Sequence, residues 1–195
     1  VQEKAKDLNP LLEASDALIK IREHALSWMC DPTRIAILGF SAGGHLAASL
    51  AVLHNHEVLS SRQNIKDENN RPDAAVLCYP VITSGQYAHR ESIGWVSGGD
   101  AKLKDLMSLE HQVNSKASPT FIWHTVTDAS VPVENSILLA LSLRREQVPF
   151  ELHLFESGNH GLSMCTEEVG TPHTLCRQWV GLASTWLNSR FHHTL

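Results

Sequence analysis

Between about Pro10 and Met29, an apolar residue recurs at every third or fourth position. That spacing places the apolar side chains on one face of an α-helix. Asn9 and Pro10 are typical of a helix start, and Asp31-Pro32 is typical of a stop. We therefore predict an amphipathic helix here, with a buried face formed by Leu11, Ala14, Leu18, Ile21, Ala25 and Trp28.

Short apolar runs alternate with further segments of helical spacing along the rest of the chain. A continuously apolar run is typical of a strand covered on both faces. The predicted strands are Arg34–Leu38, Asp73–Tyr79, Thr120–His124 and Phe150–Phe155, and the predicted helices are Ala42–His54, Val133–Glu146 and a last helix opening at Thr171-Pro172. This alternation favours an α/β fold, with a mainly parallel sheet covered by helices on both sides.

The predicted helices also have predicted inward faces. These comprise Leu46, Leu50 and Leu53 in the second helix, Ile137, Ala140 and Leu141 in the third, and Leu175, Trp179, Ala183 and Trp186 in the last. The polar stretch from Asn55 to Arg71 is interpreted as a surface connection, and Thr83 to Lys104 as loops and short helical turns.

Size and composition indicate one ordinary globular domain, which we expect to span residues 1–195. The chain is 43% apolar and 19% charged. A net charge of -5 and scattered basic residues leave no surface suited to nucleic acid. No apolar run approaches the roughly 20 residues that span a bilayer, and Val1–Pro10 does not resemble a signal peptide. We therefore expect a cytoplasmic protein that does not bind membranes.

The cysteines and histidines do not indicate a metal site. Cys30, Cys78, Cys165 and Cys176 lack Cys-x-x-Cys spacing and lie mainly in apolar segments, where a free thiol behaves as a small apolar group. The twelve histidines include no His-Glu-x-x-His pair and no Cys/His cluster. We expect reduced, structural cysteines and no bound metal.

The segment from Gly39 to Gly43 reads Gly-x-Ser-x-Gly and lies between a predicted strand and a predicted helix. In that context the motif predicts a tight turn that holds Ser41 in a strained conformation, with its hydroxyl above the sheet edge. We expect the glycines on both sides to remove side chains that would collide, and Gly44 to let the helix lie close to the strands. The helix start would direct the Ala42 N–H at the oxygen of an attacked carbonyl, as an oxyanion-hole donor.

A serine nucleophile needs a histidine base, which in turn is oriented by a carboxylate. In folds of this kind the chain order is Ser, then Asp or Glu, then His. Asp128 follows the strand that ends at His124, and His160 follows the strand that ends at Phe155, so both lie at strand ends where α/β sheets place their sites. We predict a Ser41, Asp128 and His160 triad.

Other readings of these residues stay open. Asp128 could be a solvated loop residue or a helix cap, and His160 a turn residue. We interpret His124 as a hydrogen-bonded core histidine and His45 as a residue that packs or bonds locally. Tyr79, at a strand end beside the predicted site, is a candidate for binding the acyl group of a substrate.

Four stretches resemble acetyl-xylan-esterase-like α/β-hydrolases, which are small carboxylesterases. They are Asp31–Ala47, Arg71–Ile82, Trp123–Ser136 and Glu151–Gly161, and they are distributed over most of the chain. The resemblance implies a three-layer α/β-hydrolase fold and hydrolysis of small acyl esters, such as acetyl groups on sugars, with no metal or organic cofactor. It carries the triad onto Ser41, Asp128 and His160.

The resemblance also implies that the N-terminal third of the fold is missing, including a Gly-rich loop that completes the oxyanion hole. Loss of one such donor costs about 10²- to 10³-fold in turnover. We therefore expect a longer chain to be the functional unit, and the unpaired edge of strand 35–38 to favour association with a second copy. Two alternatives remain: a serine peptidase of the prolyl-oligopeptidase type, and a non-catalytic binding protein with a hydrolase fold.

Overall fold

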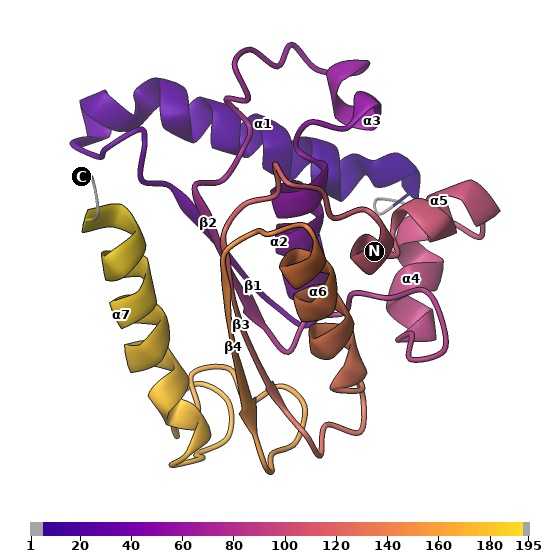
Figure 1. The fold of residues 1–195 in the computed structure, drawn as a ribbon, viewed down its shortest axis with the longest axis vertical. Coiled ribbons are helices and arrows are strands. Elements are labelled where there is room, and N and C mark those ends of the chain that lie inside the picture. The colour runs from indigo at the N-terminus through magenta and orange to yellow at the C-terminus, as the bar shows by residue number, and fades with distance from the viewer. Residues whose placement is uncertain (1–5, 193–195) are drawn as a thin grey trace.

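One parallel sheet organises the molecule, a computed structural model that describes residues 6–192 (Figure 1). The start of the polar segment 1–10 lies outside the described residues. The strands are β1 (Ala36–Phe40), β2 (Ala74–Cys78), β3 (Thr120–Thr125) and β4 (Phe150–Phe155). They pair in the order β1-β2-β3-β4, and every pair is parallel. The predicted parallel α/β sheet is therefore confirmed.

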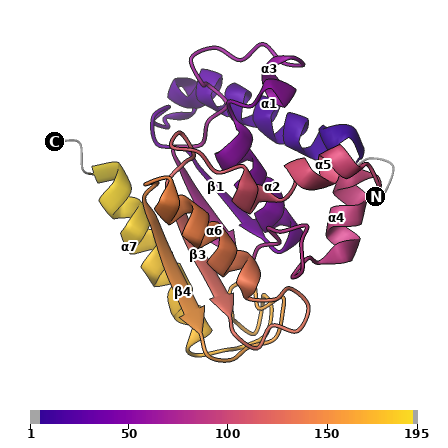
Figure 2. The ribbon, with the colours of Figure 1, turned by 45° about the vertical axis from the view of Figure 1, so that its right-hand side comes forward.

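Helices cover both faces of this sheet. The α-helices are α1 (Asn9–His24), α2 (Ala42–Leu53), α3 (Glu57–Ser60), α4 (Arg90–Ser97), α5 (Ala101–Leu106), α6 (Glu134–Arg145) and α7 (Trp179–His192). Shorter 3₁₀ turns are η1 (Lys6–Leu8), η2 (Ala25–Trp28), η3 (Leu109–His111) and η4 (Cys176–Gln178). Figures 1 and 2 show α7 on one face of the sheet and α2 with α6 on the other.

Two apolar cores follow from the alternation of side chains along the central strands. Leu77 and Ile122 belong to the core that includes α1, α2 and α6. Phe121 and Trp123 belong to the core under α7, where the Trp123 ring stacks on Trp179 with ring centroids 5.4 Å apart. The sheet is thus the middle layer of three.

The first helix differs from its prediction at its C-terminal end. It ends at His24, and the chain continues as the 3₁₀ turn η2 rather than as α-helix to Met29. Within α1 the buried face follows Leu11, Ser15 and Leu18, and the 3₁₀ turn, with three residues per turn, moves Trp28 off that face. Ile21 is 39% exposed and Trp28 is 55% exposed, so both are wrongly placed in the predicted buried face. At the other end, Leu8 rather than Asn9 occupies the N-cap, without a side-chain cap.

The last two helices also correct the sequence analysis. In α6 the buried face follows Ser136, Leu139, Ala140 and Leu143, whereas Leu141 is 62% exposed. Helix α7 begins at Trp179, not near Thr171, because a 3₁₀ turn precedes it. The His173 ring accepts a hydrogen bond from Cys176 N at the start of that turn. Leu175 is consequently 57% exposed.

Strand β1 is at one edge of the sheet and does not match the pattern of a strand covered on both faces. Ala36 is exposed, and Leu38 is 49% exposed on the same face. The strand begins two residues later than predicted and runs directly into the turn at Ser41. The segment 83–104, expected to hold only loops and short turns, includes the eight-residue helix α4, followed by α5.

All four cysteines are free. Three are buried, as their apolar surroundings predict, while Cys30 is exposed. Burial raises the pKa of the Cys176 thiol to about 11, which keeps it protonated and unreactive.

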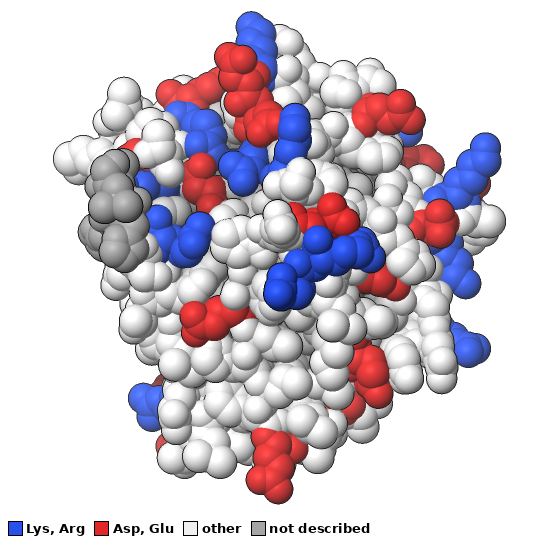
Figure 3. All heavy atoms as spheres, viewed as in Figure 1, with Lys and Arg blue, Asp and Glu red and all other residues white. Residues whose placement is uncertain are grey.

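Positive and negative side chains are interspersed over the face shown in Figure 3, with no large area of one sign. Within residues 6–192, no helix is long and apolar enough to cross a membrane. The same residues contain no group of three or more potential ligand side chains that could hold a metal ion.

Candidate active site

Ser41 occupies a strained turn between β1 and α2. Its backbone has φ 54° and ψ −120°, a conformation that non-glycine residues rarely adopt. The neighbouring chain holds it there, since Ser41 N donates to Cys78 O at 3.0 Å and Val81 N donates to Ser41 O at 3.2 Å. The strain predicted from the motif is therefore present.

Two of the glycines around Ser41 are required by close approach. A Cβ on Gly39 would collide with the Gly43 carbonyl, and a Cβ on Gly44 would lie 2.9 Å from Pro80 Cβ. A Cβ on Gly43 would meet nothing within 4 Å. The expectation of steric necessity is right for Gly39 and Gly44 and wrong for Gly43, whose hydrogen points into open space.

Side chains from three loops meet at the carboxyl ends of the strands. Ser41 Oγ lies 2.7 Å from His160 Nε2, and His160 Nδ1 lies 2.6 Å from Asp128 Oδ2. These three residues follow β1, β4 and β3, and parallel strands bring all such loops to one edge. Because a carboxylate only accepts, His160 Nδ1 carries the proton and Nε2 is free to accept the Ser41 hydroxyl proton.

The Asp128 carboxylate is buried and fully engaged. Its Oδ1 accepts hydrogen bonds from the backbone N–H groups of Ser130 and Val131, at 2.9 and 3.0 Å. Burial by itself raises the pKa of this carboxyl, but hydrogen bonds from His124, His160 and Val131 outweigh it and hold the pKa well below its usual range. Asp128 is therefore ionised at neutral pH.

The loop that carries His160 is fixed by neighbouring elements. Gly158 O accepts hydrogen bonds from the hydroxyls of Thr125 and Thr127, at 2.9 and 3.2 Å. Further along, Ser163 N donates to the Tyr79 hydroxyl at 2.9 Å, and Ser163 O accepts from Trp179 Nε1 at 3.0 Å.

Tyr79 is itself buried against the site. Its ring packs edge-on against the His160 imidazole, with centroids 5.0 Å apart, and burial raises the pKa of its hydroxyl to about 12. Tyr79 thus contacts the base and its loop, and its ring also packs edge-on against Trp123 of β3. Its predicted role in binding a substrate stays a prediction.

Ala42 is the first residue of α2, so its N–H belongs to the helix-terminal amides that have no intrahelical acceptor. It also lines an apolar cavity of about 320 Å³ between the starts of α1 and α2 and helix α4. Trp95 and Val96 of α4 and Met107 form much of its wall. A developing negative charge at Ser41 would therefore lie close to a helix N-terminus and beside an apolar cavity.

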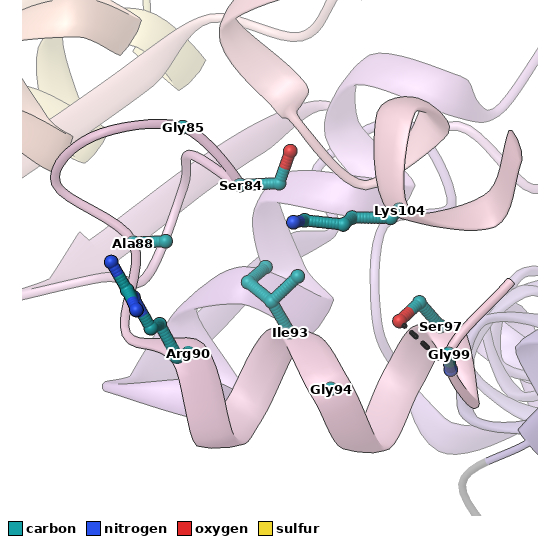
Figure 4. Close-up of a pocket in the computed structure, with 9 residues that line it drawn as sticks. All are labelled: Ser84, Gly85, Ala88, Arg90, Ile93, Gly94, Ser97, Gly99 and Lys104. Atoms are coloured by element: carbon teal, nitrogen blue, oxygen red, sulfur yellow. Dashed lines mark hydrogen bonds between the residues drawn. The ribbon is translucent and has the colours of Figure 1, made fainter. Parts of the chain in front are cut away.

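A second cavity, of about 540 Å³, lies among α4, α5 and the loop after β2 (Figure 4). Lys104 extends across it above Ile93 toward Ser84, while Arg90 lies near Ala88. None of the three triad candidates is among the described residues that line this cavity. It is therefore separate from the site at Ser41.

Two histidines set aside in the sequence analysis lie near the site. His45 is buried and makes a long-range contact, with Nε2 3.0 Å from Met107 O, in addition to local contacts with Ser49. His124 is fully buried, as expected of a core histidine, but its Nε2 also lies 3.3 Å from Asp128 Oδ2. Asp128 lies four positions after His124, just beyond the end of β3. This spacing is the sequence feature that could have indicated the contact.

The chain is similar to one protein family and to curated proteins that carry its fold as part of a longer chain. The profile of the BD-FAE family matches residues 10–143. An "Endo-1,4-beta-xylanase B" from Butyrivibrio fibrisolvens is 41% identical over 161 residues, which are 82% of this chain and 25% of that protein. An "Acetylxylan esterase" from Xylanibacter ruminicola is 30% identical over 153 residues, covering 75% of this chain and 29% of that protein. The chain therefore spans between a quarter and a third of these curated relatives.

Solved structures share the fold over a longer region. The crystal structure of an acetyl ester-xyloside bifunctional hydrolase from Caldicellulosiruptor lactoaceticus superposes with a TM-score of 0.80 and 39% identity. The match covers 93% of this chain and 65% of that one.

Proposed function

Because the chain belongs to the BD-FAE family of α/β-hydrolases, we propose that it is a serine esterase that removes small acyl groups, above all acetyl groups, from sugars. The observation that carries the proposal is the continuous relay from Ser41 Oγ through the His160 imidazole to Asp128, with contacts of 2.7 and 2.6 Å. We also propose that residues 1–195 form a single domain. The names of the relatives support the acetyl and sugar components.

The first half-reaction is acyl transfer to Ser41. His160 Nε2 takes the hydroxyl proton as Ser41 Oγ attacks the ester carbonyl carbon, and Asp128 stabilises the imidazolium that forms. The carbonyl oxygen becomes an oxyanion, which the Ala42 N–H at the start of α2 stabilises. When the carbon–oxygen bond to the alcohol breaks, His160 returns the proton to the leaving alcohol. The product is an acyl ester of Ser41.

The second half-reaction repeats these steps with water. His160 removes a proton from water, the resulting hydroxide attacks the acyl carbonyl, and the proton passes to Ser41 Oγ as the carboxylic acid leaves. The strained turn supports the role of Ser41 as nucleophile. Its backbone conformation exposes the hydroxyl at the sheet edge formed by the carboxyl ends of the strands.

We further propose that the apolar cavity beside Ala42 receives the acyl group. The polar groups of its His45 and Ser49 are already bonded within the protein, to Met107 O and His45 O. Apolar atoms of a substrate would therefore displace water there without leaving these groups unpaired.

Covalent labelling tests the nucleophile directly. A fluorophosphonate probe should add to Ser41, as located by peptide mass spectrometry, and labelling should disappear in Ser41→Ala. Ser142→Ala, which removes a buried hydroxyl near the C-terminal end of α6, is the matched control and should label as the unmodified protein does. A folded protein whose Ser41 remains unlabelled would favour the non-catalytic binding protein.

Hydrolysis of p-nitrophenyl acetate tests the other two members. Asp128→Asn should lower kcat by about 10⁴, because the amide favours the wrong tautomer of His160. His160→Ala should lower kcat at least as far, because it removes the base. Rates equal to those of the unmodified protein in both variants would reject the proposed mechanism.

A further inference from the structure

His124 is a second histidine in contact with the relay. It lies near the end of β3, and its side chain is fully buried. Its Nδ1 lies 2.7 Å from Ser136 Oγ of α6, and its Nε2 lies 3.0 Å from Val131 O and 3.3 Å from Asp128 Oδ2. Both ring nitrogens therefore face polar atoms of the protein.

These partners assign the tautomer of His124. A carbonyl and a carboxylate oxygen can only accept, so Nε2, which faces both, carries the ring proton. Nδ1 then accepts from the Ser136 hydroxyl. The Nε2–H of His124 donates to Val131 O at 3.0 Å, and Asp128 Oδ2 lies 3.3 Å from the same nitrogen. The bond from Ser136 of α6 to Nδ1 holds the ring in this orientation.

The two oxygens of Asp128 are consequently held by different sets of donors. Oδ1 accepts from the backbone of Ser130 and Val131, while Oδ2 faces both His160 Nδ1 at 2.6 Å and His124 Nε2 at 3.3 Å. A polar N–H 3.3 Å from Oδ2 offsets part of the negative charge that would otherwise act on His160.

We propose that His124 is a positioning residue that acts through Asp128: the positive end of its Nε2–H dipole, 3.3 Å from Oδ2, limits how strongly that oxygen binds the imidazolium of His160. The inference rests on the proposed triad. Its consequence concerns basicity, because a base bound too tightly in its protonated form returns its proton poorly.

Few other ionisable groups face this pair among the described residues. The His160 ring contacts Asp128, Ser41 and, from the end of β2, Tyr79. Asp128 contacts His160 and His124. A change in the titration of His160 on altering His124 is therefore transmitted through Asp128.

The test measures the titration of His160 itself. Protein with carbon-13 histidine is titrated by NMR, and the His160 signal is assigned with His160→Asn. His124→Phe keeps a ring in the core but removes the N–H, so the whole charge of Oδ2 acts on the imidazolium. The titration midpoint of His160 should rise by about 0.5 to 1 pH unit, and the pH profile of fluorophosphonate labelling should shift by the same amount.

His124→Gln is the conservative control, because its side-chain amide restores an N–H donor near the position of Nε2. Its midpoint should stay within about 0.2 pH unit of the unmodified value. If His124→Phe does not fold, Ser136→Ala, which releases Nδ1, should raise the midpoint by a smaller amount. An unchanged or lowered midpoint in whichever of these two variants is folded would overturn the inference. The titration does not depend on reactivity, so failure of the unmodified protein to label would reject the esterase proposal separately.

Discussion

His54, at the C-terminal end of α2, should make the fold sensitive to acid. Its side chain is fully buried, and in the described part of the chain neither ring nitrogen has a hydrogen-bond partner. A carboxylate oxygen, Glu68 Oε2, is 3.9 Å from Nε2. Burial, together with the Arg71 charge, lowers the pKa of His54 from 6.5 to about 4. The folded state therefore strongly prefers the neutral ring.

The sign and size of the effect follow from proton linkage. Between pH 6.5 and about 4, the unfolded chain binds a proton at this site more readily than the folded chain does. The stability that the folded state gains from a neutral His54 ring is fully present above pH 6.5, and it is lost as the pH falls toward the pKa of His54 in the folded state. Lowering the pH from 7 to 5 should remove about 2 kcal/mol of unfolding free energy through His54 alone.

Urea unfolding at pH 7 and pH 5 measures this difference. His54→Leu should lose about 2 kcal/mol less than the unmodified protein between the two pH values, which corresponds to about 1 M in the difference between midpoints. His111→Leu, at a side chain that is 65% exposed, should retain the original pH dependence. Equal losses in His54→Leu and the unmodified protein would refute the reasoning.

Three further substitutions test features of the fold. Gly44→Ala should destabilise the protein by about 1 to 3 kcal/mol and slow fluorophosphonate labelling, because its Cβ would press on Pro80, whereas Gly43→Ala should change the thermal midpoint little. Trp179→Ala should cost about 3 to 5 kcal/mol in urea unfolding, because it empties the centre of the core under α7. Leu38→Lys should reduce self-association in sedimentation velocity, because it places a charge on the exposed face of the edge strand; an unchanged sedimentation profile would argue against association through β1.

Strand positions could be predicted from the sequence because they depend on short apolar runs. The predicted strand Phe150–Phe155 coincides with β4. Helix faces were less predictable, since local spacing does not show which side meets the sheet. Leu141 satisfies the helical period but points to solvent, while Ser136 is buried and bonded to His124.

The candidate site was predictable for a physical reason that goes beyond the motif. Parallel strands bring the loops that follow them to one edge, so Ser41, Asp128 and His160 could be expected together from their order alone. Their contact distances agree with that expectation, and their catalytic roles stay proposals. The contact between His124 and Asp128 was not predicted, because a buried strand histidine is most simply a core residue.

The relay joins Ser41 and His160, which are 119 positions apart in the chain. A contact of such long sequence separation forms slowly, because the intervening chain must first be ordered. During refolding, helical circular dichroism should therefore recover before the nucleophile becomes reactive. Chemical reactivity at Ser41 reports that the whole topology from β1 to β4 has been completed.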